Sequence, residues 1–177
     1  MEIFRTDMSA ADVEACWPLL SEDERLRAEG LSGNVKLRFL VSRAFRRRVL
    51  GSGAEILSDE HGRPYVKGDP VYFSMSHSGD LLVLAVDDHP VGVDAEFMKE
   101  RDFAKLSAWF FGESIPCRDD FYRRWTRFEA GLKLAGLPLF SKNAPEPKHL
   151  HSEVLGDHML SVASNCGIGL PLSITVL

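Results

Sequence analysis

Three consecutive β-strand patterns between residues 71 and 97 constrain the fold of this chain more than any other feature. Their sequences are VYFSM, DLLVLAVDD and PVGVDAEF, with the polar hinge SHSG between the first two. Apolar runs of this length, bounded by Gly, Pro and Asp, are typical of strands with a buried face. Helical spacing of apolar residues predicts a helix before the run, over 33–50, and another after it that ends at Gly136.

The rest of the chain carries weaker signals for the same two kinds of element. Ser9 is expected to cap a helix over 10–20, and Ser21 with Glu24 has the spacing of a capping box. Short strands are also expected over 2–7, 158–164 and 170–177, and a helix over 103–111. The segment EHGRPYV (60–66) is expected to be a turn that leads into a strand.

The third strand of the central run ends with two acids, Asp94 and Glu96. Because side chains alternate along a strand, the two carboxylates share one face, about 6–7 Å apart. Two such charges repel by about 2–3 kcal/mol at an effective dielectric constant near 20. Either water screens them at a solvated strand end, or a hard divalent cation such as Mg²⁺ lies opposite them.

A third acid occurs on the later helix. Trp125, Glu129 and Lys133 recur every four residues and therefore share one helix face. Glu129 and Lys133 could form an ordinary ion pair on the helix surface. Alternatively, Glu129 is a further metal ligand, and Lys133 neutralises phosphate oxygens that the metal does not reach.

Ser76 and His77 lie in the hinge SMSHSG, between the first two central strands. A nucleophilic Ser–His pair is disfavoured, because adjacent residues seldom orient in that way and the chain has no G-x-S-x-G elbow. A contact with a phosphate group is the better interpretation of this pair. The HLH segment at 149–151 lacks further ligands at metal-site spacing and is expected to be mostly loop.

Composition excludes several classes of protein. The net charge of −5 and the pI near 5.7 argue against non-specific nucleic-acid binding. The chain has no apolar run of the roughly 18 residues that a membrane span needs, and its acidic start does not resemble a secretory signal. Cys16, Cys117 and Cys166 form no CxxC pair, which predicts free thiols in the reducing cytoplasm.

An internal echo suggests how the chain is organised. GDLLVLAV from Gly79 resembles GDHMLSVA from Gly156, and each is followed by a strand pattern that begins at a proline. The echo is either coincidence or the trace of two related halves. Thr175 stands where the second copy would need the equivalent of Asp94, so one site per chain is expected.

Four blocks together resemble the 4′-phosphopantetheinyl transferases, of the larger type that activates peptide and polyketide synthetases. The blocks are SEDERLRAE (21–29), GRPYV (62–66), FSMSHSG with VGVDAEF (73–97), and WTRFEAGLK (125–133). The resemblance implies an α+β fold of two similar α/β halves, residues 1–88 and 89–177, related by a pseudo-twofold axis. Coenzyme A would bind between the halves of a single chain, which is therefore expected to act as a monomer.

The same resemblance implies a reaction and a set of site residues. The 4′-phosphopantetheine group of coenzyme A would pass to a serine of an apo acyl or peptidyl carrier protein, leaving 3′,5′-ADP. Asp94, Glu96 and Glu129 match the family's Mg²⁺ ligands. Glu129, Lys133 and His77 are the expected catalytic residues: Glu129 as candidate base for the serine and Lys133 at the diphosphate. The expected coenzyme A contacts are Arg27, Arg63, Ser76, His77 and Lys133.

Three departures from the family pattern keep an alternative open. Phe128 stands where the family usually has a lysine, with Arg124 one turn earlier as a possible replacement. The chain is also trimmed after ERLRAE, and its ending is brief. The alternative is a non-catalytic relative that binds coenzyme A or a carrier protein. A third interpretation takes RAFRRR (43–48) as a basic helix that docks an acidic partner.

Overall fold

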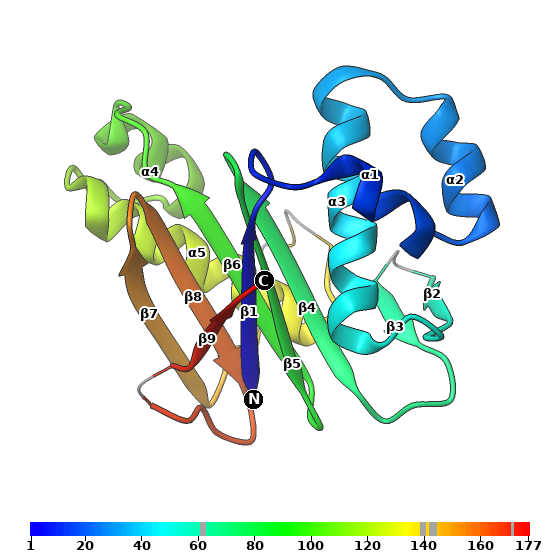
Figure 1. Cartoon of the computed structure of the whole chain (residues 1–177). Coiled ribbons are helices and arrows are strands. Elements are labelled where there is room, and N and C mark those ends of the chain that lie inside the picture. Colours follow the sequence, from blue (N-terminus) through cyan, green and yellow to red (C-terminus); the bar gives the residue numbers. More distant parts are fainter. Residues whose placement is uncertain (61–62, 139–140, 142–144, 171) are drawn as a thin grey trace.

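The computed structural model describes residues 1–60, 63–138, 141, 145–170 and 172–177. It is a mixed α+β fold with several sheets, in which strands occupy the middle and helices gather on both sides (Figure 1). The elements are β1 (Glu2–Asp7), α1 (Val13–Cys16), the 3₁₀ helix η1 (Trp17–Leu19), α2 (Glu22–Glu29), α3 (Gly33–Leu50), β2 (Ile56–Ser58), β3 (Pro64–Val66), β4 (Tyr72–Ser78), β5 (Leu81–Asp87), β6 (Val91–Phe97), α4 (Phe103–Phe111), α5 (Arg118–Ala135), β7 (His149–Leu155), β8 (His158–Ser164) and β9 (Ile174–Val176).

Two of the sheets contain the same strand order. One runs β4-β5-β1-β9, the other β6-β8-β7, and β2 with β3 forms a small hairpin. In the first sheet, the hairpin β4-β5 pairs through β5 with the earlier strand β1. In the second sheet, the hairpin β7-β8 pairs through β8 with the earlier strand β6. All of these pairs are antiparallel. Both hairpins turn at a Gly-Asp pair, and Gly79 and Gly156 each have φ of 59°, a left-handed conformation that glycine adopts without strain. The two Gly-Asp copies therefore supply the turn and second strand of similar hairpins. The strands that follow them differ, because β6 pairs antiparallel with β8, whereas β9 pairs in parallel with β1.

The core consists of layers on either side of β5, which is buried on both faces. Leu82 and Leu84 pack in a cluster with α3, through residues such as Leu40 and Phe45. On the opposite face, Val83 and Ala85 meet side chains from β6 and β8. The continuous apolar run of this strand follows from burial on both sides.

Some sequence expectations about local structure are wrong in detail. The serines and histidine of SMSHSG lie within β4 rather than in a hinge, and the turn comes at Gly79–Asp80. The HLH segment is the start of β7 rather than loop. Asp12, not Ser9, caps α1, because its carboxylate accepts from the N–H groups of Glu14 and Ala15. The predicted helices over 33–50 and 103–111, the capping box and the helix end at Gly136 are confirmed.

A very close approach between α5 and β6 positions the candidate site. A Cβ atom added at Gly92 would lie 2.0 Å from the carbonyl oxygen of Ala130 and 2.6 Å from the nitrogen of Leu134. Only glycine permits this spacing. A buried hydrogen bond of 2.6 Å between the hydroxyls of Thr126 and Ser161 also joins α5 to β8. The helix is thereby held against the face of β6 that carries its two acids.

Within the described ranges, none of the helices combines the length and the apolar character needed to cross a membrane.

Candidate active site

Three carboxylates converge from a strand and a distant helix. Asp94 and Glu96 come from β6 and Glu129 comes from α5, and one oxygen of each lies within 4.8 Å of the others. Asp94 is almost completely buried, at 1% exposure, whereas Glu96 and Glu129 are partly buried. The helix acid thus faces the strand pair, and the solvated strand end considered above is not what the chain forms.

Lys133 is the cation of this cluster. Its Nζ donates to Oδ1 of Asp94 at 2.7 Å and to the carbonyl oxygen of Val93 at 3.0 Å. The lysine therefore pairs with an acid on the strand, and not in the surface pair with Glu129 that helical spacing suggested. One lysine leaves most of the negative charge of three carboxylates uncompensated.

The excess negative charge contributes to raised pKa values of two of the acids. Burial raises the pKa of Glu129 to about 8, and the nearby charges of Asp94 and Glu96 add to this, against the opposing effect of Lys133. Burial also raises the pKa of Glu96; a hydrogen bond from Ser78 opposes this effect, and the charge of Asp94 adds to it. Without an added cation, the site resists full ionisation.

One buried oxygen in the cluster has no hydrogen-bond partner. Oδ2 of Asp94 is inaccessible to solvent and has no hydrogen-bond partner, whereas Oδ1 of the same carboxylate accepts hydrogen bonds from both Lys133 and Ser76. An unpaired buried carboxylate oxygen is costly unless a ligand or ion completes it. Hard carboxylate donors, surplus negative charge and this unpaired oxygen all fit a divalent cation such as Mg²⁺.

Serines from β4 orient two of the acids. Ser76 donates its hydroxyl hydrogen to Oδ1 of Asp94 at 2.8 Å, and Ser78 donates to Oε2 of Glu96 at 2.7 Å. Sequence reasoning assigned Ser76 to a phosphate contact and did not single out Ser78. The signal was present in the serines at every second position, 74, 76 and 78, which a strand places on one face.

The other expected contacts lie at different places. His77 is exposed and lies on the opposite face of β4 from Ser76. The guanidinium of Arg63 lies beside Gly136, with Nη1 3.1 Å from the position that a Cβ would take there, and so sits at the end of α5 that carries Lys133. Arg27 is exposed on α2, and its guanidinium lies 5.5 Å from the centre of the Phe39 ring.

The interpretation of RAFRRR as a basic docking surface is wrong. Arg46 is 6% exposed, and both Arg46 and Arg47 bind Glu24 of α2, at 3.4 Å and 3.1 Å. Burial lowers the pKa of Arg46 to about 10, with a contribution from the charge of Arg43. Burial alone would raise the pKa of Glu24, but the hydrogen bond from the backbone N–H of Ser21 and the charge of Arg47 lower it. These arginines join two helices.

Phe128, at the place of the family lysine, packs in an aromatic cluster. Its ring centre lies 6.2 Å from that of Phe111, nearly perpendicular to it. Phe128 also lines a groove of about 610 Å³ on α5, together with Arg123, Arg124 and Arg127. Arg124 was expected to replace the missing lysine, but it forms an ion pair with Glu113 at 2.8 Å.

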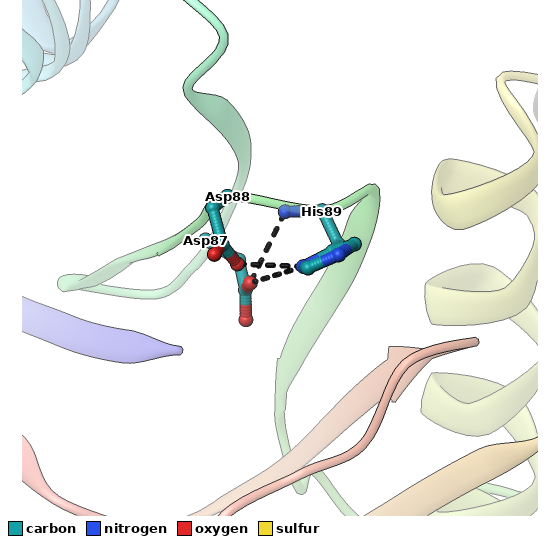
Figure 2. Close-up of side chains that lie close together, drawn as sticks. All are labelled: Asp87, Asp88 and His89. Carbon is teal, nitrogen blue, oxygen red and sulfur yellow. Dashed lines mark hydrogen bonds and ion pairs between the residues drawn. The ribbon is translucent and has the colours of Figure 1, made fainter.

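A second acidic cluster, Asp87, Asp88 and His89, lies at the turn between β5 and β6 (Figure 2). Its acids already have partners: Asp87 binds the Met1 amine at 3.1 Å, and Nδ1 of His89 lies 2.6 Å from Asp88. Asp88 is highly exposed. Among the residues that the structure describes, only Arg46 and Asp94 have a buried side-chain atom without a partner, so this turn lacks the unpaired oxygen that marks the Asp94 site.

Comparison with known proteins assigns the chain to a family. No protein-family model matches the sequence. The 4′-phosphopantetheinyl transferase psf-1 of Bacillus pumilus is 30% identical over 172 residues, covering 77% of this chain and 69% of the relative. The 4′-phosphopantetheinyl transferase of Bacillus subtilis is 29% identical over 167 residues, covering 85% and 73%. AcpT of Salmonella typhi, also a 4′-phosphopantetheinyl transferase, is 31% identical over 126 residues, covering 64% and 66%. Identity of this extent shows that the chain belongs to the 4′-phosphopantetheinyl transferase family of enzymes.

Proposed function

We propose that this chain transfers the 4′-phosphopantetheine group of coenzyme A to a serine of an apo acyl or peptidyl carrier protein and releases 3′,5′-ADP. One observation carries the proposal. The carboxylates of Asp94, Glu96 and Glu129 lie close together, Oδ2 of Asp94 is buried without a partner, and Lys133 pairs with Oδ1 of the same acid. Such a cluster suits a reaction in which positioning and charge neutralisation, rather than a covalent intermediate on the protein, supply the rate.

Mg²⁺ is the proposed cofactor, held by Asp94, Glu96 and Glu129. When bound, it would neutralise diphosphate oxygens and polarise the phosphorus that is attacked. The surplus negative charge of the site, in which one lysine faces three carboxylates, supports this assignment.

The chain's own residues divide the remaining work. Glu129 takes the proton of the incoming serine hydroxyl, the role that the resemblance implies, and its position among the acids of β6 supports this assignment. Lys133, one turn further along α5, contacts the diphosphate through the N–H that its bonds to Asp94 and Val93 leave over, and offsets charge that develops on the departing 3′,5′-ADP. The proton taken by Glu129 then passes to solvent.

Coenzyme A is the proposed donor, with Arg27, Arg63 and His77 as its phosphate contacts. Arg63 lies beside Gly136, at the end of α5 that carries Lys133, which supports a position near the diphosphate. Ser76 is a weaker candidate for such a contact, because its one hydroxyl hydrogen is already donated to Asp94. A phosphate contact from the Ser76 hydroxyl would require that bond to break.

The halves 1–88 and 89–177 are proposed to be related by a pseudo-twofold axis. The matching strand orders β4-β5-β1 and β7-β8-β6 support this division, as do the two Gly-Asp hairpin turns. Serines of the first half contact acids of the second, so one chain supplies both sides and is proposed to act as a monomer. The three free cysteines are compatible with the proposed cytoplasmic location.

The test is a transfer assay. The protein is incubated with coenzyme A, Mg²⁺ and an apo carrier protein, and the mass of the carrier protein is measured by mass spectrometry. The expected result is a mass increase of one phosphopantetheine group, lost in Glu129→Gln and in the presence of EDTA. No increase with several unrelated carriers would contradict the proposal.

A non-catalytic role remains the second candidate because of one observation. Phe128 offers no cation beside Glu129, and Arg124 is occupied by Glu113. A protein that only binds coenzyme A or a carrier would take up coenzyme A in calorimetry, transfer nothing, and keep its biological effect in Glu129→Gln. The transferase loses that effect in the same variant.

A further inference from the structure

Two strands from different sheets lie side by side at the candidate site without a backbone ladder between them. Among the described strands, β4 forms the edge of one sheet and β6 the edge of the other. Serine side chains bridge this seam instead. Ser74 accepts from the backbone N–H of Val93 at 3.0 Å, and Ser78 accepts from that of Phe97 at 3.0 Å. Ser76, between them, donates to Asp94.

We propose that Ser78 is a positioning residue that holds Glu96 in place to bind a divalent cation, as Ser76 holds Asp94. The inference rests on the proposed cation site. It adds a residue to which the resemblance assigned no role, and it gives the serines of β4 a role in presenting acids rather than in contacting coenzyme A.

The polarity of the bonds at Ser78 follows from its partners. A backbone N–H can only donate, so the bond from Phe97 uses a lone pair of the Ser78 hydroxyl. The single hydroxyl hydrogen is then available for Oε2 of Glu96, at 2.7 Å. The carbonyl oxygen of Ser78 also lies 3.0 Å from Nε2 of His158, across to β8. Hydrogen bonds to both its hydroxyl and its carbonyl oxygen therefore hold Ser78 in place as the donor to Glu96.

Each serine occupies one oxygen of its acid and leaves the other available. Ser76 and Lys133 both bind Oδ1 of Asp94, and Oδ2 has no partner. Ser78 binds Oε2 of Glu96 in the same way. A glutamate has several rotatable bonds, and repulsion from two neighbouring carboxylates favours conformations that turn it away from them. The bond from Ser78 opposes that tendency before any cation arrives.

Partners that orient metal ligands usually matter about 10- to 100-fold for metal affinity. Ser78→Ala is therefore expected to weaken binding of Mn²⁺, a spectroscopic substitute for Mg²⁺, by about tenfold or more. Binding is followed by electron paramagnetic resonance of free Mn²⁺, with the metal alone and no coenzyme A. Ser78→Thr keeps a hydroxyl at this position and is expected to retain most of the affinity.

Ser74→Ala is the matched control. Like Ser78→Ala, it removes a serine that accepts from a backbone N–H of β6, but Ser74 contacts no carboxylate of the site. Both variants should show comparable losses of thermal stability, and Ser74→Ala should bind Mn²⁺ as tightly as the unaltered protein. The difference in Mn²⁺ affinity between the two variants then measures how far Ser78 positions Glu96, apart from its contribution to holding β4 against β6.

The outcomes separate this inference from the proposed function. Equal Mn²⁺ affinity in Ser78→Ala and the unaltered protein overturns the inference alone, and so does an equal loss in both alanine variants. Absence of Mn²⁺ binding by the unaltered protein overturns both the inference and the proposed cation site. Transfer to the carrier protein is scored independently of either result.

Discussion

Nζ of Lys133 lies 2.7 Å from Oδ1 of Asp94, although the two residues are 39 positions apart and belong to α5 and β6. The pair fixes the helix to the strand at the point where the acids gather. Lys133 is largely covered and Asp94 nearly completely so, at 22% and 2% side-chain exposure. In the metal-free protein, Lys133 therefore compensates the buried negative charge of Asp94.

Lys133→Ala removes that compensation and should cost stability as well as transfer activity. Breaking one side of a buried ion pair costs on the order of 3 kcal/mol, because the remaining charge is left unpaired. Denaturation by urea measures the loss, and Mg²⁺ should restore part of it in this variant. Lys67→Ala is the control, since Lys67 pairs with Glu55 in an exposed position and should cost less than about 1 kcal/mol. Equal losses in the two variants would show that Asp94 does not depend on Lys133.

The stability of the metal-free protein should fall as pH rises toward 8. The pKa of Glu129 is about 8 in the folded protein, against 4.5 for the ordinary side chain. The folded state thus holds a proton that the unfolded state releases, and the stability from this proton is complete below pH 4.5 and lost as pH rises through about 8. Urea denaturation in EDTA across this range measures the slope. Glu129→Gln should flatten the slope, and an unchanged slope in that variant would assign the titration to another group.

Gly92→Ala should displace α5 from β6. The added Cβ would lie 2.0 Å from the carbonyl oxygen of Ala130, which is backbone and cannot turn aside. A loss of at least about 2 kcal/mol is expected from such overpacking, together with weaker Mn²⁺ binding, because Glu129 moves with the helix. Gly53→Ala is the control, since nothing lies within 4 Å of its Cβ position. A Gly92→Ala protein with unaltered stability would mean that α5 does not pack this closely on β6.

Arg46→Ala should destabilise the contact between α2 and α3. Arg46 is buried and binds Glu24, so its removal leaves a cavity and weakens the ion pairs that hold that acid. A loss of about 2 kcal/mol or more is expected for a buried, hydrogen-bonded side chain. Arg48→Ala, at an exposed position of the same helix, should stay within about 0.5 kcal/mol of the unaltered protein. Thermal unfolding of both variants decides whether this segment is structural or a free basic surface.

Periodicity predicted those elements whose pattern matches their burial. The helix over 33–50 and the end of α5 at Gly136 are confirmed, because apolar spacing and a left-handed glycine are local signals. β7 was missed, because its start, HLH, is polar and partly exposed at the edge of a sheet. The serines of β4 suggested a hinge for a related reason: they are polar but face another strand rather than solvent.

The acids of the site were predictable, and their supporting contacts were not. Strand and helix spacing placed Asp94, Glu96 and Glu129 on definite faces, and the resemblance supplied the reason for them to meet. The contacts of Arg46 with Glu24 and of Ser78 with Glu96 join segments that are 22 and 18 residues apart. Pairs at such separations depend on tertiary packing, which no local pattern in one sequence encodes.

The central claim is that one divalent cation binds between the acids of β6 and α5. The most direct measurement is an anomalous difference map from crystals of the protein soaked in Mn²⁺. The account predicts a single strong peak within coordination distance of Asp94, Glu96 and Glu129. A map without a peak there, or with its only peak at Asp87, Asp88 and His89, would contradict the account.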